Sequence, residues 1–108
     1  MSLQVASLSV ELVAVLRPLV PRIRRQDRSL ADQLVRAASS VALNIAEGEY
    51  SDPGNRRARF YTASGSANET LAALRVAVAW GYVSASAVEP AVVLAGRVIA
   101  MLWRLTRG

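Results

Sequence analysis

Apolar residues recur at intervals of three and four along almost the whole chain, and no stretch shows the strict alternation of a half-buried strand. Turn residues divide this pattern into separate segments. The predicted helices cover residues 3–17, 29–50, 55–80 and 86–106. Helices joined by short connections pack beside one another in alternating directions. We therefore predict an all-α fold, an antiparallel up-down four-helix bundle that occupies residues 1–108 as a single domain.

Turn and cap residues set the predicted helix ends. Pro18 ends the first helix, since proline has no backbone N–H to continue it. Ser29, with Asp32 three residues on, resembles a capping box and predicts the start of the second helix. The turn cluster at 51–54 and then Gly81 mark the remaining breaks.

The last predicted helix is apolar on more than one face. At 100° per residue its charged side chains share an arc of about 80°; they are Glu89, Arg97, Arg104 and Arg107. The remaining arc is wider than the stripe that one bundle core covers. A second apolar surface must then be covered by another molecule, so we predict a homo-oligomer.

Polar side chains form matching stripes on the second and third predicted helices. If these helices fold back on each other at the turn, residues whose numbers sum to about 106 lie at equal height, given a constant rise per residue. The pairs are Glu47 with Arg59, Asn44 with Thr62, Ser40 with Ser66, and Arg36 with Glu69. We call these eight residues the polar ladder. We predict that the polar ladder is partly buried and fixes the register of the helices, within a chain or between subunits. The alternative is that each stripe is the solvent-exposed face of an ordinary amphipathic helix.

Charge and missing residue types narrow the chemistry. The formal net charge is +5, all thirteen basic residues are arginine, and the chain contains neither cysteine nor histidine. Thiol nucleophiles, thiolate metal sites and the usual neutral-pH proton shuttle are therefore excluded. Glu47 and Glu69 are the candidates for metal ligands or an acid/base pair, but carboxylate-bridged bundles also use histidine. We predict a protein that is not an enzyme, with no catalytic residue, no metal and no cofactor.

The first residues lack a basic leader and a small-residue cleavage pattern. The longest apolar run, around residues 88–103, is interrupted by Glu89, Pro90 and Arg97, and a membrane span needs about 20 mostly apolar residues. We therefore expect a cytoplasmic protein without a membrane partner.

Two segments carry a family resemblance. RAASSVALNIAEGEY, followed by RFYTASGSANETLAAL and then GY, is similar to the four-helix-bundle family encoded in intervening sequences of 23S rRNA genes. The matching residues are Arg36, Ser40, Asn44, Ile45, Ala46, Glu47, Gly48, Phe60, Gly65, Ser66, Glu69, Gly81 and Tyr82. The resemblance implies a homopentamer with no known enzymatic activity. The family also resembles the accessory protein of diversity-generating retroelements, a basic pentamer that contacts nucleic acid and a reverse transcriptase.

Two classes of function remain open. The first is a nucleic-acid-associated or nucleoprotein accessory oligomer, whose candidate binding residues are Arg22, Arg24, Arg25 and Arg28 in the first connection, with Arg56 and Arg57 at the start of the third helix. Arginines at a helix N-terminus oppose the macrodipole, so the last two do not stabilise their helix. The alternative is that these arginines lie in solvated loops, bind no ligand and form local ion pairs with Asp27 and Asp52. The second class is a structural or adaptor oligomer that binds a protein partner through its surplus apolar surface and has no nucleic-acid role.

Overall fold

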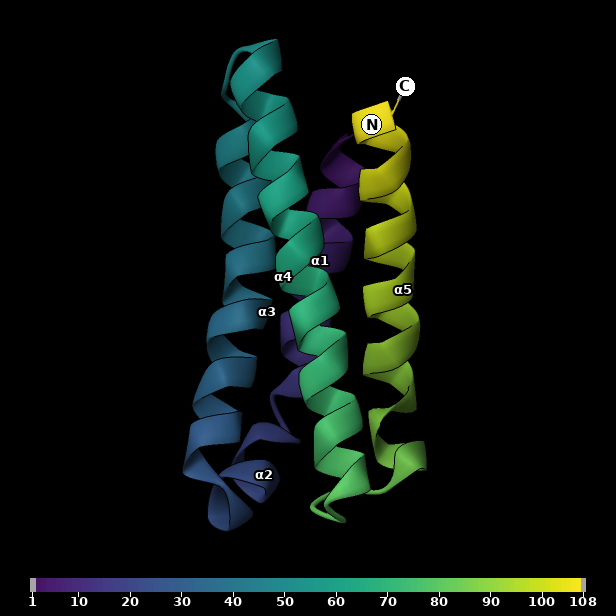
Figure 1. Cartoon of the computed structure of the whole chain (residues 1–108). Helices are drawn as coiled ribbons and strands as arrows, with labels where there is room; N and C mark the ends of the chain where they lie inside the picture. The colour runs from purple at the N-terminus through teal and green to yellow at the C-terminus, as the bar shows by residue number, and fades with distance from the viewer. Residues whose placement is uncertain (1, 108) are drawn as a thin grey trace.

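The computed structural model describes residues 2–107, and over that range it contains helices and no strand. The five helices are α1 (Ser2–Leu16), α2 (Val20–Gln26), α3 (Arg28–Glu49), α4 (Pro53–Ala79) and α5 (Ala85–Arg107) (Figure 1). The predicted all-α class is confirmed, and the four long helices begin and end within two residues of their predicted bounds. The two end residues of the predicted domain, 1 and 108, lie outside the described range.

The short helix α2 is the element that periodicity does not predict. Residues 18–28 are a connection by sequence pattern, but seven of them form about two helical turns. Pro21 lies in the first turn, where a missing N–H costs nothing. Ile23 is fully buried and Leu19, just before α2, is nearly so. These two side chains pin α2 against the core, while the arginines around Ile23 stay in water. A segment this short, with one buried residue, shows no helical period.

Aspartates cap the N-termini of α3 and α4. Asp27, rather than the predicted Ser29, is the N-cap of α3, and its carboxylate accepts a 3.0 Å hydrogen bond from the Leu30 N–H. The Tyr82 hydroxyl donates to the other carboxylate oxygen at 3.2 Å, which ties the α4–α5 connection to the start of α3. Burial and the adjacent Asp27 carboxylate raise the pKa of Tyr82.

Asp52 caps α4 in the same way. It accepts hydrogen bonds from the backbone and the side chain of Asn55, at 3.0 and 2.8 Å, and these bonds lower the pKa of the Asp52 carboxyl. Both turns that reverse the chain around α3 are therefore fixed by local carboxylate bonds.

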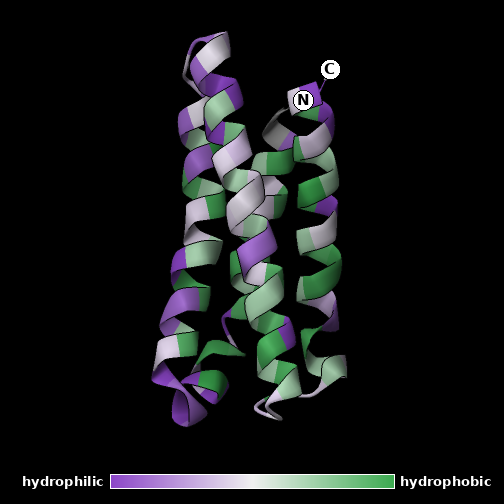
Figure 2. Ribbon diagram, viewed as in Figure 1, coloured by the Kyte–Doolittle hydropathy of each residue, from purple (hydrophilic) through white to green (hydrophobic). Residues whose placement is uncertain are grey.

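The long helices surround one core and alternate in direction. α3 packs on α4, α4 on α5, α5 on α1 and α1 on α3, while α2 packs on α3. The chain ends lie at one end of the molecule and α2 at the other (Figure 1). The largest fully buried side chains come from all five helices: Leu12, Ile23, Leu34, Ile45, Phe60, Leu74 and Leu102. Hydrophobic residues occupy much of the length of α5 (Figure 2), and Val93, Trp103 and Leu105 among them are exposed.

α5 is also apolar enough and long enough to cross a membrane by length and composition alone, and α1 with α2, bent by 50°, passes the same criterion together. Core helices of water-soluble bundles meet that criterion too. Only 33% of the most apolar 18-residue stretch of α5 is buried within the chain. The second apolar surface predicted for this helix is therefore present on the single chain.

Phe60 of α4 packs directly over Gly48 of α3. A Cβ atom on Gly48 would lie 2.7 Å from Phe60 Cε1 and 2.9 Å from Phe60 Cδ1. The Phe60 ring is itself buried, so it has no room to move away. Glycine is thus required here by the ring of the neighbouring helix, and the contact fixes how far α4 slides along α3.

We predict that Gly48→Ala lowers the free energy of unfolding by about 1–3 kcal/mol through overpacking. Gly65→Ala is the matched control, because nothing lies within 4 Å of its Cβ position. The control should leave stability unchanged or raise it by about 0.5–1 kcal/mol, since glycine is unfavourable inside a helix. Urea unfolding followed by circular dichroism measures both; equal effects of the two substitutions would contradict the Phe60 contact.

Candidate functional site

The α3–α4 contact brings two pairs of the polar ladder together within one chain. Arg59 Nη2 lies 3.0 Å from Glu47 Oε2, and the Ser66 hydroxyl donates to the Ser40 hydroxyl oxygen at 2.8 Å. Ser40 and Ser66 are half-buried and come from opposite helices. The ladder, where it forms, is therefore a contact inside the chain.

Asn44 joins these two pairs instead of meeting Thr62. Its amide donates to the Ser40 carbonyl and hydroxyl oxygens, at 2.9 and 3.0 Å, and its carbonyl oxygen accepts from Arg59 at 3.3 Å. Thr62 donates to the carbonyl of Ala58 in its own helix, at 3.1 Å. The predicted Asn44–Thr62 pair is wrong, because the threonine hydroxyl finds an acceptor one turn back.

The predicted Arg36–Glu69 pair is also wrong. Within residues 2–107 no carboxylate lies within 4 Å of the Arg36 guanidinium, and both side chains are exposed. Equal height along two helices does not make two outward-pointing side chains meet, and exposed ions gain little by pairing.

The ion pair of Glu47 with Arg59 is only partly shielded from water. The Arg59 and Glu47 side chains are 48% and 57% exposed. Water screens such a pair, so its worth is about 0–1 kcal/mol. The hydroxyl and amide bonds of Ser40, Asn44 and Ser66 therefore carry the specificity of the ladder, with the ion pair at its wet edge.

The carboxylates of the ladder are not gathered as ligands. Among the described residues, no group of three or more His, Cys, Asp or Glu side chains lies close enough to hold a metal ion. Glu47 is engaged by Arg59, and Glu69 lies on the exposed surface of α4.

The arginines predicted to bind nucleic acid lie at opposite ends of the molecule. Arg22, Arg24 and Arg25 are on α2 and Arg28 begins α3; we call these four the basic α2 end. Arg56 and Arg57 are at the start of α4, beyond the far end of α3. α3 has 22 residues, which gives a separation of about 33 Å at 1.5 Å per residue. The two groups of arginines therefore form separate surfaces, with the helix α3 between them.

The basic α2 end is largely uncompensated. Arg24 pairs with Asp32, and all four arginines are exposed. No carboxylate lies within 4 Å of Arg22, Arg25 or Arg28 in the part of the chain that the structure describes. The predicted pairing with Asp27 is absent there, because that carboxylate caps α3 and accepts from Tyr82.

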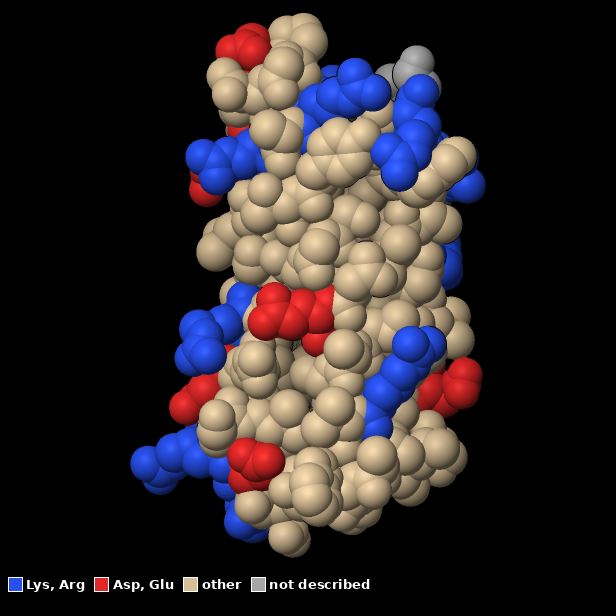
Figure 3. Space-filling model, in the orientation of Figure 1, with Lys and Arg blue, Asp and Glu red and all other residues tan. Residues whose placement is uncertain are grey.

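A second cluster forms at the other end, and it includes residues that the sequence does not predict as a site. Arg107 of α5 donates to the Tyr61 hydroxyl of α4 at 2.8 Å, and its guanidinium carbon lies 5.7 Å from the Tyr61 ring centre and 5.1 Å from that of Trp103. Arg57 of α4 and Arg104 of α5 belong to the same end. We call these five residues the Arg–aromatic cluster; basic side chains gather over this end in Figure 3.

Local electrostatics agree with this geometry. Burial acts to raise the pKa of Tyr61, but the nearby Arg57 and Arg107 guanidinium groups outweigh it and lower the pKa below its ordinary value. The tyrosine oxygen thus lies close to two positive charges. The spacing of Trp103 and Arg107, one helical turn apart, is the signal in the sequence; only the antiparallel contact of α4 with α5 reveals Tyr61 as their partner.

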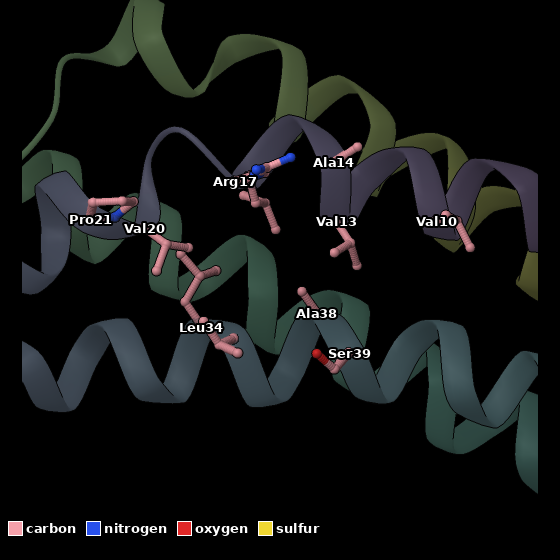
Figure 4. Close-up of a pocket in the computed structure, with 11 residues that line it drawn as sticks. Val10, Val13, Ala14, Arg17, Val20, Pro21, Leu34, Ala38 and Ser39 are labelled. Atoms are coloured by element: carbon pink, nitrogen blue, oxygen red, sulfur yellow. The ribbon is translucent and has the colours of Figure 1, made fainter.

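An apolar groove of about 450 Å³ lies between α1, α2 and α3 (Figure 4). Val10, Val13 and Val35 line it and remain 61%, 38% and 39% exposed. Arg17 is the one charged residue among those that line it. The groove is thus a surface with hydrophobic walls and few polar groups.

We predict that Glu47→Ala and Arg59→Ala show a coupling energy of about 0.2–1 kcal/mol in a double-mutant cycle, as expected of a half-exposed pair. Arg36→Ala and Glu69→Ala form the matched control cycle and should show none. Urea unfolding of the variants measures both. Equal coupling in the two cycles would contradict the observed pairing.

Comparisons with known proteins agree with the fold and the motif. The family model described as 23S rRNA-intervening sequence protein matches residues 1–104. A crystal structure from Bacteroides thetaiotaomicron, of a protein of unknown function from the S23 ribosomal protein family, superimposes with a TM-score of 0.89 at 19% identity, over 96% of this chain and 99% of that one. No curated protein matches the chain. With the Asn-Ile-Ala-Glu-Gly motif on α3, the bundle-like packing of the long helices and a model match over nearly its whole length, the chain belongs to the 23S rRNA-intervening sequence protein family.

Proposed function

We propose that this chain is a non-enzymatic, oligomeric protein of the cytoplasm that associates with nucleic acid as a nucleoprotein accessory factor. In this proposal the four long helices act as an antiparallel up-down four-helix bundle, and several copies assemble, five of them by analogy with the homopentamer that the family resemblance implies. The observation that carries the proposal is the basic α2 end, where Arg22, Arg25 and Arg28 are exposed and no carboxylate of the described residues compensates them.

Phosphate is the ligand chemistry that such a surface favours. Guanidinium groups donate paired hydrogen bonds to phosphate oxygens, and neutralising phosphates releases counterions. The net charge of +5 adds a long-range attraction. A homo-oligomer repeats the basic α2 end in every subunit, which multiplies the number of phosphates that one assembly can bind on the same nucleic acid.

Assembly is supported by the apolar surface that the chain leaves uncovered. Val93 of α5 is 51% exposed and Leu43 of α3 is 62% exposed, in addition to the groove lined by Val10. Exposed apolar surface of this kind is commonly covered by a partner. In the proposal, copies of the chain cover it.

The apolar groove also favours the second candidate function, an adaptor oligomer that binds a protein partner. A groove with valine walls and a single arginine suits an apolar helix better than a phosphate chain.

The names of the matching family and of the structural relative both refer to ribosomal RNA or the ribosome. These names support a nucleic-acid setting over a purely structural one.

We predict that the protein shifts a structured RNA in a gel at low salt and that binding weakens steeply as salt rises. Arg22→Gln, Arg25→Gln and Arg28→Gln together should weaken binding. They should also reduce the slope of log affinity against log salt concentration by about 0.7–0.9 for each phosphate that the variant no longer neutralises. A gel-shift titration over a salt series measures both effects.

The control is Arg36→Gln, Arg75→Gln and Arg97→Gln, which removes the same charge from other surfaces. Equal weakening in both variants would show non-specific attraction, and no shift at low salt would remove the nucleic-acid role. Sedimentation of the same samples should show an oligomer; a monomer at micromolar concentration would contradict the assembly.

A further inference from the structure

The Arg–aromatic cluster differs from the basic α2 end because its charges are interleaved with exposed rings. Trp103 is 55% exposed and Tyr61 is 43% exposed. The Arg107 guanidinium carbon lies 5.7 and 5.1 Å from the two ring centres, so it is held against two aromatic faces rather than extended into water. Near the basic α2 end Trp80 stacks on Tyr82, but among the described residues no arginine lies over either ring.

Arg107 is oriented but not saturated. Its Nη1 donates to the Tyr61 hydroxyl, and a guanidinium carries five N–H donors. Within residues 2–107 no other side-chain hydrogen bond or ion pair uses the remaining donors. A guanidinium fixed by two rings loses little further freedom when it binds a planar anion.

No carboxylate of the described residues neutralises this end. The ion pairs found between residues 2 and 107 are Arg24 with Asp32 and Arg59 with Glu47, and neither involves Arg57, Arg104 or Arg107. Asp52, the acid at the start of α4, is occupied by its bonds to Asn55. The cluster therefore keeps its positive charge for a partner from outside.

Helix stability explains only part of this arrangement. Arg104 and Arg107 lie in the last turn of α5, where cations favour the helix. Arg57, the fifth residue of α4, gains nothing from the helix dipole, yet it lies one turn from Tyr61, and its charge acts to lower the pKa of that hydroxyl. Three arginines beside two exposed rings, with no carboxylate of the described residues to pair with them, point to a ligand with negative charge and flat apolar faces.

We infer that the Arg–aromatic cluster is a second nucleic-acid contact of the chain, one that holds a single-stranded segment. In this arrangement Arg57 and Arg107 bind phosphates while an unpaired base stacks on the exposed face of Trp103. Duplexes present phosphates but keep their base faces stacked inside, whereas single strands offer both. The inference rests on the proposed nucleic-acid function and adds to it the class of ligand and its site, about 33 Å from the basic α2 end, the length of the 22-residue helix α3.

Tryptophan fluorescence tests the stacking directly. Trp80, the other tryptophan, is 70% exposed and stacks on Tyr82 at the far end of α4, so Trp80→Phe leaves Trp103 as the sole reporter. A single-stranded RNA of about 12 nucleotides, within the site sizes usual for such surfaces, should quench Trp103. A duplex of equal length and heparin, a polyanion without bases, should leave it largely unquenched. The matched control, Trp103→Phe, keeps Trp80 as the reporter near the basic α2 end, and there the difference between single strand, duplex and heparin should disappear.

Affinity measurements on the full chain complete the test. Trp103→Ala should weaken single-strand binding by about tenfold, as expected when one base is no longer stacked, and leave duplex and heparin binding unchanged. Arg107→Lys should keep heparin binding but not single-strand binding, because lysine keeps the charge and lacks the planar donors. Trp103→Phe, which keeps a ring, guards against loss of fold and should weaken binding less than alanine.

The outcomes separate this inference from the proposed function. If the single strand binds and depends on Arg22, Arg25 and Arg28, but is indifferent to Trp103 and Arg107, the inference is overturned and the proposed function stands. Equal quenching of Trp103 by heparin and by the single strand would also overturn it, as it would show charge without stacking. If no nucleic acid binds at low salt, the inference falls together with the proposed function.

Discussion

The contact of the Phe60 ring with the bare backbone of Gly48 sets the register of α3 against α4, and the polar contacts between these helices follow from that register. The Phe60 ring occupies the place that a side chain at position 48 would need, so this position along α3 accepts the ring only because it is glycine. In that position Ser66 reaches Ser40 and Arg59 reaches Glu47. The polar bonds add little energy at their exposed edge, but any other register would leave the half-buried hydroxyl and amide groups without partners, which costs more than the bonds contribute.

The separate contact of α4 with α5 places the start of α4 beside the end of α5 and creates the Arg–aromatic cluster at one end of the molecule. The basic α2 end lies at the other, and apolar surface occupies the length between them. This distribution of charge is compatible with the proposed function, in which copies of the chain pack through the apolar surface and the arginines at the two ends of the molecule bind phosphates. The Ser40, Asn44, Glu47 and Ser66 side chains make contacts between α3 and α4, whereas the proposed ligand binding uses arginine and tryptophan residues.

The long helices could be predicted from the sequence because each buries a stripe that repeats over many turns, and the α3–α4 register could be predicted because polar residues matched in antiparallel order. α2 could not, since a seven-residue helix held by Ile23 has no period to detect. The predictions of the Arg36–Glu69 and Asn44–Thr62 pairs were wrong because two residues at equal height along neighbouring helices can still point in different directions around the helix axes. The sequence shows the arginines only as residues of one kind. In the fold, α3 separates the arginines of the basic α2 end from those at the start of α4, and the α4–α5 contact brings Arg57 close to Tyr61 and Arg107. Gly65, a residue of the resemblance, has open space at its Cβ position, and nothing in the chain explains it.

The chain has no cysteine, so a single engineered pair can test the α3–α4 register without competing thiols. The Ser40 and Ser66 hydroxyl oxygens are 2.8 Å apart, within reach of a disulfide once both are sulfur. Under mild oxidation Ser40→Cys with Ser66→Cys should form a disulfide inside one chain, seen as a monomer on a non-reducing gel and as a linked peptide pair by mass spectrometry, while Ser40→Cys with Asn68→Cys should not. Disulfides that link different chains, or equal yields from both pairs, would contradict the register on which the account depends.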